Sequence, residues 1–148
     1  MTRRVLERAP EPAFPWRPHE KSSSLGGLAT HLANLPHWGA QILDRDFYDL
    51  ATSTHRTESA TAAEVLTLFD AHVAEVRRLL VDRPDSALLS PWTLRRGTQI
   101  VMSMPRLVAL RRFLLHHVIH HRGQLTVYLR LQGVALPPLY GPTADERA

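Results

Sequence analysis

The chain has 148 residues, of which 44% are hydrophobic and 22% charged, and it carries a formal net charge of +4. This composition is typical of a folded globular domain, and the absence of cysteine excludes disulfides, thiolate metal ligands and a cysteine nucleophile. No apolar run approaches the roughly 20 residues of a membrane span, and the N-terminal residues lack the apolar core of a secretory signal. We therefore expect a cytoplasmic protein.

Almost all of the 18 basic residues are arginines. They occur singly or in pairs, such as Arg77/Arg78 and Arg111/Arg112, close to acidic or apolar residues. No basic run or nucleic-acid-binding motif is present, so the pairs are typical of a solvated surface. Nucleic acid is the weakest candidate partner.

The N-terminal third predicts a short helix, a Pro-rich break and then a long helix. Residues 2–8 form the short helix, and four prolines between residues 10 and 18 interrupt regular structure. Serines 22–24 can cap a helix with an apolar stripe at Leu25, Leu28, Leu32 and Leu35. Pro36 should kink or end this helix, although the apolar pattern can resume to about Asp44.

The remainder predicts two more long helices. "TAAE" at 61–64 has the form of a capping box, and apolar residues then repeat with a period near 3.6 until just before Pro84. Residues 85–104 indicate an irregular crossover, in which "WTLRRGTQIVM" can form a small hairpin. A third long helix should run from Pro105 to about Gln132, with Gly133 after its end. These elements predict an all-α fold, most simply a bundle.

Four of the nine histidines lie within "HHVIHH", residues 116–121. On a wheel of 100° per residue, His117 and His121 fall on the apolar side of the last helix. That side also carries Leu107, Leu110, Leu114, Leu125 and Tyr128. The wheel places His116 off this stripe and His120 at its flank. Arg122 falls away from the core, which predicts a surface or interface position.

Two inward imidazoles spaced i, i+4 have two interpretations. Each can be a hydrogen-bonded core residue, or both can bind one metal ion, for which neutral imidazole is a good ligand. A third ligand would come from another helix, where His31 beside the leucine stripe is favoured and His37 is weaker. His72 is more typical of a packed core histidine, and the loop residues His19 and His55 should be solvated.

Several segments together resemble the DinB family of small helical metalloenzyme-like proteins: "WRPHEKS" (16–22), "HLANLPHWG" (31–39), "HHVIHHRGQLTVYLRLQGV" (116–134) and "YGPTADE" (140–146). The likeness covers nearly the whole chain and implies one four-helix-bundle domain over residues 1–148. The family's three metal-binding histidines correspond to His31, His117 and His121. Its full-length first helix corresponds here to a stub, within a 1–23 segment that is otherwise Pro-rich, and residues 133–148 form a Pro-rich tail.

A shortened first helix would leave an apolar groove on the other three helices. A second copy of the chain can cover that groove, so we expect a homodimer. The alternative is that the Pro-rich segment folds down as a lid and fills the groove with Phe14 and Trp16.

Three histidine ligands leave an open coordination position, which is typical of a catalytic site. We expect a metal-dependent hydrolase or thiol transferase of unknown substrate, assisted by Gln124 and Tyr128. Zinc or nickel is favoured, with iron, manganese or cobalt as alternatives. Asp145 or Glu146 can fold back as a further ligand or partner. The competing hypothesis is a non-catalytic, metal-stabilised stress-response or interaction protein.

Overall fold

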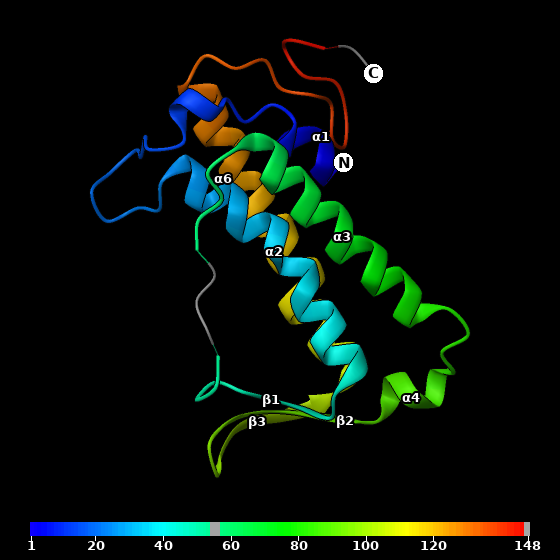
Figure 1. The fold of residues 1–148 in the computed structure, drawn as a ribbon. Helices are drawn as coiled ribbons and strands as arrows, with labels where there is room; N and C mark the ends of the chain where they lie inside the picture. Colours follow the sequence, from blue (N-terminus) through cyan, green and yellow to red (C-terminus); the bar gives the residue numbers. More distant parts are fainter. Residues whose placement is uncertain (54–56, 147–148) are drawn as a thin grey trace. The chain divides into compact units, whose positions relative to one another are not determined.

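The structure, a computed structural model, describes residues 1–53 and 57–146. His55 lies outside the described residues. Helices make up most of the elements (Figure 1), and none of those described combines the length and apolarity of a membrane-spanning segment. In chain order the elements are α1 (Thr2–Leu6), η1 (Glu11–Ala13), α2 (Leu25–Asp44), β1 (Phe47–Asp49), α3 (Ala62–Leu80), α4 (Asp85–Leu89), β2 (Pro91–Arg96), β3 (Gln99–Pro105), α5 (Arg106–Leu110), the π-helical η2 (Arg111–His116) and α6 (His117–Leu131).

Two compact units divide the chain. Unit 1 contains Met1–Ala33, Glu58–Phe69 and Val118–Ala148, and unit 2 contains Asn34–Thr57 and Asp70–His117. Helices α2, α3 and α6 contribute residues to both units, because three of the boundaries fall inside a helix. The single domain expected from the sequence stays a prediction.

In unit 1, α2 begins at the predicted serine cap. The Gly27 N–H donates to Ser24 Oγ at 2.9 Å, and the Ser24 hydroxyl donates to Glu58 Oε1 at 2.6 Å. A Cβ added at Gly26 would lie 2.7 Å from that carboxylate oxygen and 2.9 Å from Phe14. Only a residue without a side chain lets both neighbours approach the first turn of α2 this closely.

The Pro-rich segment packs on the first turn of α2, as the lid alternative predicts. The N–H groups of Leu25 and Gly26 donate to the carbonyls of Trp16 and Phe14, at 2.8 and 3.0 Å. These bonds satisfy two donors that a helix start leaves without intrahelical partners. Phe14 is buried, and Trp16 meets the edge of Tyr128 with ring centroids 5.7 Å apart. Phe14 and Trp16 thus occupy part of the surface that motivated the homodimer, and the homodimer itself stays a prediction.

Helix α3 starts with a capping arrangement close to the predicted one. The Glu64 N–H donates to Thr61 Oγ1 at 3.2 Å, and the Glu64 carboxylate accepts from the Ala60 N–H at 2.8 Å. The return bond therefore reaches one residue further back than in a standard capping box. The helix ends at Leu80, before Pro84, as expected.

Unit 2 contains a three-stranded sheet, so the all-α fold expected from the sequence is not confirmed. Strands β2 and β3 form the hairpin that the sequence allowed, with Gly97 at a φ of 58° in its turn. The strand-forming residues Trp92 and Leu94 bury one face of β2. Strand β1 pairs with β2 in parallel, and this long-range pairing has no local sequence signal.

Asp49, at the end of β1, holds this strand to the hairpin. Its carboxylate accepts from the N–H groups of Gly97 and Ala51, each at 2.9 Å, and from Arg95 Nε at 3.1 Å. These donors, with Gly97 first, keep the pKa of Asp49 below its usual value. The carboxylate thereby stays charged and fixes the position of the hairpin turn.

A buried arginine, Arg106, caps the C-terminal end of α2. Helix α2 continues through Pro36 to Asp44, and Arg106 donates there to the carbonyls of Ile42 and Arg45 and, at 2.8 Å, to Asp46 Oδ1. A cation at a helix C-terminus pairs with carbonyls that lack intrahelical donors and with the negative end of the helix dipole.

The last helical run does not keep the uniform register assumed on the wheel. Leu107 is 41% exposed, whereas Arg122, predicted at the surface, is 6% exposed. The π-helical η2 lies between them, and its wider i→i+5 turn rotates the chain less per residue than an α-helix does. The buried face of α6 therefore follows a shifted register that includes Arg122, Leu125 and Leu129.

Helix α6 ends as predicted, with Gly133 at a φ of 71°. The Gly133 N–H donates to the Arg130 carbonyl and the Val134 N–H donates to the Leu129 carbonyl, both at 3.0 Å. This pair of bonds is a Schellman motif, and it sends the Pro-rich tail away from the helix axis.

Candidate metal centre

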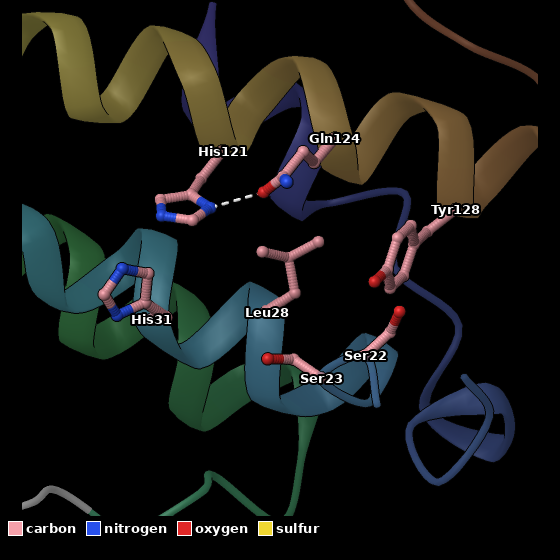
Figure 2. A pocket seen from close by; sticks show the side chains of 7 residues that line it. All are labelled: Ser22, Ser23, Leu28, His31, His121, Gln124 and Tyr128. Atoms are coloured by element: carbon pink, nitrogen blue, oxygen red, sulfur yellow. Dashed lines mark hydrogen bonds between the residues drawn. The ribbon is translucent and has the colours of Figure 1, made fainter. Parts of the chain in front are cut away.

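Three histidines place their ring nitrogens close together. His31 on α2 and His121 on α6 have ring centroids 4.5 Å apart at an interplanar angle of 88°, and Figure 2 shows them on facing helices. His117 is the first residue of α6, one turn before His121 on the same helix. One ligand atom from each of the three lies within 4.8 Å of the others, so the group can hold a metal ion. These are the three residues that the sequence favoured.

Gln124 fixes the orientation of His121. Its Oε1 lies 2.6 Å from His121 Nδ1, as the dashed line in Figure 2 marks. An amide oxygen only accepts, so this contact is a hydrogen bond in the tautomer that carries its proton on Nδ1. Metal-binding histidines commonly have an outer partner of this kind on the second ring nitrogen.

A pocket of about 310 Å³ opens beside the histidines. Its lining residues are Ser22, Ser23, Leu28, His31, His121, Gln124 and Tyr128. None of these side chains is an acid, lysine or arginine. Figure 2 shows the hydroxyls of Ser22 and Tyr128 pointing toward one another at the end away from His31. The cavity therefore has imidazoles at one end and uncharged hydrogen-bonding groups at the other.

The remaining described histidines do not join the cluster. His116 is exposed, as the wheel indicated. His120, predicted at the flank of the apolar stripe, is exposed as well, although its ring lies 4.7 Å from that of His121. His37 and His72 pair with each other in unit 2, with ring centroids 5.2 Å apart. His19 is an exposed loop residue whose Nδ1 accepts from the Lys21 N–H. Among the described residues, no other set of three or more potential ligands meets in this way.

Arg122, next to His121 in sequence, ties both ends of the chain to α6. Its guanidinium donates to Thr2 Oγ1 at 3.2 Å and to the Tyr140 hydroxyl. The surface or interface position predicted for it is therefore wrong, because α1 and the C-terminal tail cover it.

The two acidic residues of the tail fold back, but onto arginines. Asp145 accepts from Arg130 at 3.1 Å, and Glu146 accepts from Arg4 and Arg8. The Arg130 guanidinium, with the Leu136 N–H, lowers the pKa of Asp145 to about 2. Both carboxylates thus serve ion pairs that hold the tail.

Sequence reasoning identified Gln124 and Tyr128 but missed three other pocket residues. Ser22 and Ser23 appeared only as candidate caps, and Leu28 only as part of the core stripe. Leu28 lies three residues before His31, hence on the same side of α2. That spacing is the signal from which its place in the pocket could have been found.

Comparison with known proteins supports the fold and the family. Residues 1–148 match the model of the DinB family. The chain is 41% identical over 66 residues to the uncharacterized protein YrdA of Bacillus subtilis, a match that spans 42% of this chain and 39% of that protein.

Two solved structures have a similar fold. A DinB-like protein from Bacillus subtilis (YjoA) superposes with a TM-score of 0.72 at 20% identity, and one from Bacillus cereus ATCC 10987 with a TM-score of 0.69 at 19% identity. Each match covers 94% of this chain and 88% of the other. With the family model matched from end to end, the chain belongs to the DinB family.

Proposed function

We propose that this protein is a metal-dependent enzyme of the DinB type, a hydrolase or a thiol transferase, with His31, His117 and His121 as its metal ligands. The observation that carries the proposal is the pocket beside His31 and His121. A structural metal site is closed by its ligands, whereas a catalytic one keeps a position open toward a cavity.

The ligand set fits a borderline divalent ion. Three imidazoles in a chain without cysteine thiolates suit zinc or nickel best, and iron, manganese or cobalt less well. Such an ion would supply a Lewis acid that lowers the pKa of a bound water or thiol. The hydrogen bond between His121 Nδ1 and Gln124 Oε1 supports this role, because metal-binding histidines commonly have such an outer partner that sets the ring orientation.

The other pocket residues have roles in binding. Tyr128 can donate a hydrogen bond to a substrate oxygen, and Trp16 packs edge-on against its ring and limits its rotation. Ser22 and Ser23 add hydroxyls on the opposite wall. An uncharged, polar wall of this kind suits a small molecule that presents hydroxyl or amide groups to it.

A non-catalytic metal-stabilised protein, active in a stress response or in interactions, is the second candidate. It is favoured by one observation: the ligands come from two helices, α2 and α6, so an ion would cross-link the fold. The two candidates predict different access to the metal. A catalytic metal should bind small added ligands through the pocket, whereas a closed cross-linking metal should not.

Cobalt substitution tests the two candidates. We expect azide or a small thiol, added to the cobalt-loaded protein, to change the visible absorption bands, because an open position accepts it. Bands that stay unchanged at saturating additive would support the closed, non-catalytic site. In a screen of ester, amide and thiol-transfer substrates, Tyr128→Phe should lower turnover while the metal content stays at the wild-type level.

A further inference from the structure

A glycine inside α2 makes room for a leucine of η2. A Cβ added at Gly39 would lie 2.6 Å from Leu114 Cδ2 and 3.1 Å from a γ-methyl carbon of Val76 on α3. Both distances are shorter than the roughly 3.5–4.0 Å at which carbon atoms pack. Glycine within a helix is less favourable than alanine, and here the Leu114 side chain occupies the space that a larger residue would need. All three residues belong to unit 2.

The residues next to this contact pack in the same way. Trp38 lies against Phe113 with ring centroids 6.0 Å apart, and Trp92 on β2 lies 5.7 Å from the same ring. Two consecutive residues of η2, Phe113 and Leu114, therefore meet two consecutive residues of α2, Trp38 and Gly39. The other four residues of η2 are exposed, so these two side chains fix its orientation.

Leu114 is bonded directly to a candidate metal ligand. The His117 N–H donates to the Leu114 carbonyl, so η2 ends on the residue that begins α6. This bond spans three residues, whereas the bonds of an α-helix span four and those of a π-helix five. The position of His117 thus depends on where the Leu114 backbone lies, and the side chain seated over Gly39 determines that.

The π-helical turn also keeps one side of this helical run facing inward. Between residues 109 and 122, the residues that are not exposed come in pairs at intervals of four: 109/110, 113/114, 117/118 and 121/122. A uniform α-helix turns about 40° beyond a full circle in four residues, so three intervals would rotate the last pair by about 120°. The wider turn of η2 removes part of this rotation. The inward side that begins at Ala109 therefore still includes His117.

We propose that Gly39 and Leu114 are positioning residues for the metal ligand His117. The Leu114 side chain, seated over Gly39, fixes η2 against α2, and the hydrogen bond from His117 to the Leu114 carbonyl places the ligand relative to it. The inference rests on the three-histidine site proposed above and concerns the assembly of that site. Close packing around residue 39 therefore determines metal affinity, although residue 39 is not a ligand.

A double-mutant cycle between the two residues tests the proposal, with zinc affinity measured by competition against a chelator. Gly39→Ala displaces Leu114, and Leu114→Val removes the δ carbons and opens a gap over Gly39. Each single variant should bind zinc about tenfold more weakly or worse. The double variant should recover most of that loss, because the added methyl group refills the gap. Independent effects would make the double variant the weakest binder of the four proteins, and that result would overturn the proposal.

Cobalt absorption separates the position of the ligand from the stability of the fold. The visible bands report how the ligands surround the ion, so Gly39→Ala should change them at saturating cobalt and the double variant should restore them. Val65→Ala is the control for lost stability, because Val65 is 1% exposed on α3, eleven residues before Val76. It should lower the melting temperature and leave the bands unchanged.

These measurements distinguish the positioning role from the metal site on which it rests. A wild type that binds neither zinc nor cobalt contradicts the three-histidine site, and the positioning role with it. A wild type that binds both metals, while Gly39→Ala keeps its affinity and its bands, overturns the positioning role alone. If Gly39→Ala does not fold, Leu114→Val and the double variant still decide the question. Equal zinc affinity in those two means that residue 39 does not act on His117.

Discussion

Two pairs of imidazoles lie at similar distances in the two units, yet only one resembles a metal site. The rings of His31 and His121 are 4.5 Å apart in unit 1, and those of His37 and His72 are 5.2 Å apart in unit 2. The first pair has His117 as a third donor, Gln124 on one ring nitrogen and a pocket beside it. Among the described residues, the second pair has no third donor. The proximity of two imidazoles is therefore not enough to indicate a metal site. A third ligand and an adjacent pocket distinguish a candidate metal site from histidines that only pack against each other.

Substitution of the clustered histidines has the largest expected effect, and it tests the difference between the two histidine pairs directly. Alanine at His31, His117 or His121 should lower metal affinity by more than the roughly 100-fold upper range seen for outer partners of metal ligands, because a direct bond is lost. Alanine at His37 or His72 should leave bound metal, measured by elemental analysis, at the wild-type level. Metal loss in His120→Ala but not in His121→Ala would show that the ligand register is wrong by one residue.

The next largest effect concerns the dependence of metal affinity on pH, which applies to the His31–His121 pair and its third ligand. Metal binds neutral imidazole, which titrates near pH ~6.5, so protons compete with the metal below that value. With three histidine ligands, affinity should fall by up to about 10³-fold between pH ~7.5 and ~5.5. Competition with a chelator of known affinity measures this slope. An affinity that stays flat over that interval is incompatible with a three-histidine site.

A smaller effect is expected from substitution of Gln124, whose hydrogen bond to His121 is one of the features that distinguish the first histidine pair from the second. Gln124→Ala removes the acceptor from His121 Nδ1 and should weaken metal binding about 10–100-fold, with the fold unchanged by circular dichroism. Gln124→Glu keeps an acceptor at the same position and should retain most of the affinity. If both variants bind metal like the wild type, Gln124 does not orient His121.

The smallest effect concerns the tail of unit 1. The pKa of Asp145 is lowered to about 2, so its ion pair with Arg130 contributes to stability above pH ~3.9 and loses that contribution as pH falls through about 2. Asp145→Asn should speed hydrogen exchange at the Leu136 amide, which donates to this carboxylate at 2.9 Å, and leave metal binding unchanged. Loss of metal in this variant would show that the tail supports the histidine site.

The sequence was most informative where a local period decides the outcome. The spacing of His117 and His121, and the position of His31 beside a leucine stripe, indicated the cluster without structural data. The same wheel misplaced Arg122, because it assumed one α-helical register throughout. No sequence signal in residues 111–116 predicts the π-helical turn that shifts this register. The covering of Arg122 by Thr2 and Tyr140 depends on segments distant in sequence, which a helical wheel does not include.

The sheet shows the same limit. The hairpin followed from strand-forming residues around Gly97, whereas β1 has three residues and pairs with a strand more than forty positions later. Ser22 and Ser23 were identified as polar residues before a helix, but their place in a pocket depends on α6. Local patterns therefore predicted the long helices, the hairpin and the histidine cluster, and tertiary contacts determined the pocket walls.

The closure of α2 by Arg106 has a consequence for how unit 2 folds. The hairpin β2–β3 closes through a turn of two residues, so it can form early and on its own. The Arg106 side chain reaches the Ile42 carbonyl across 64 positions of sequence, and a loop of that length costs more chain entropy to close. Folding of this unit should therefore begin at the hairpin and finish when Arg106 meets the end of α2, which places the last turn of that helix among its late-forming parts.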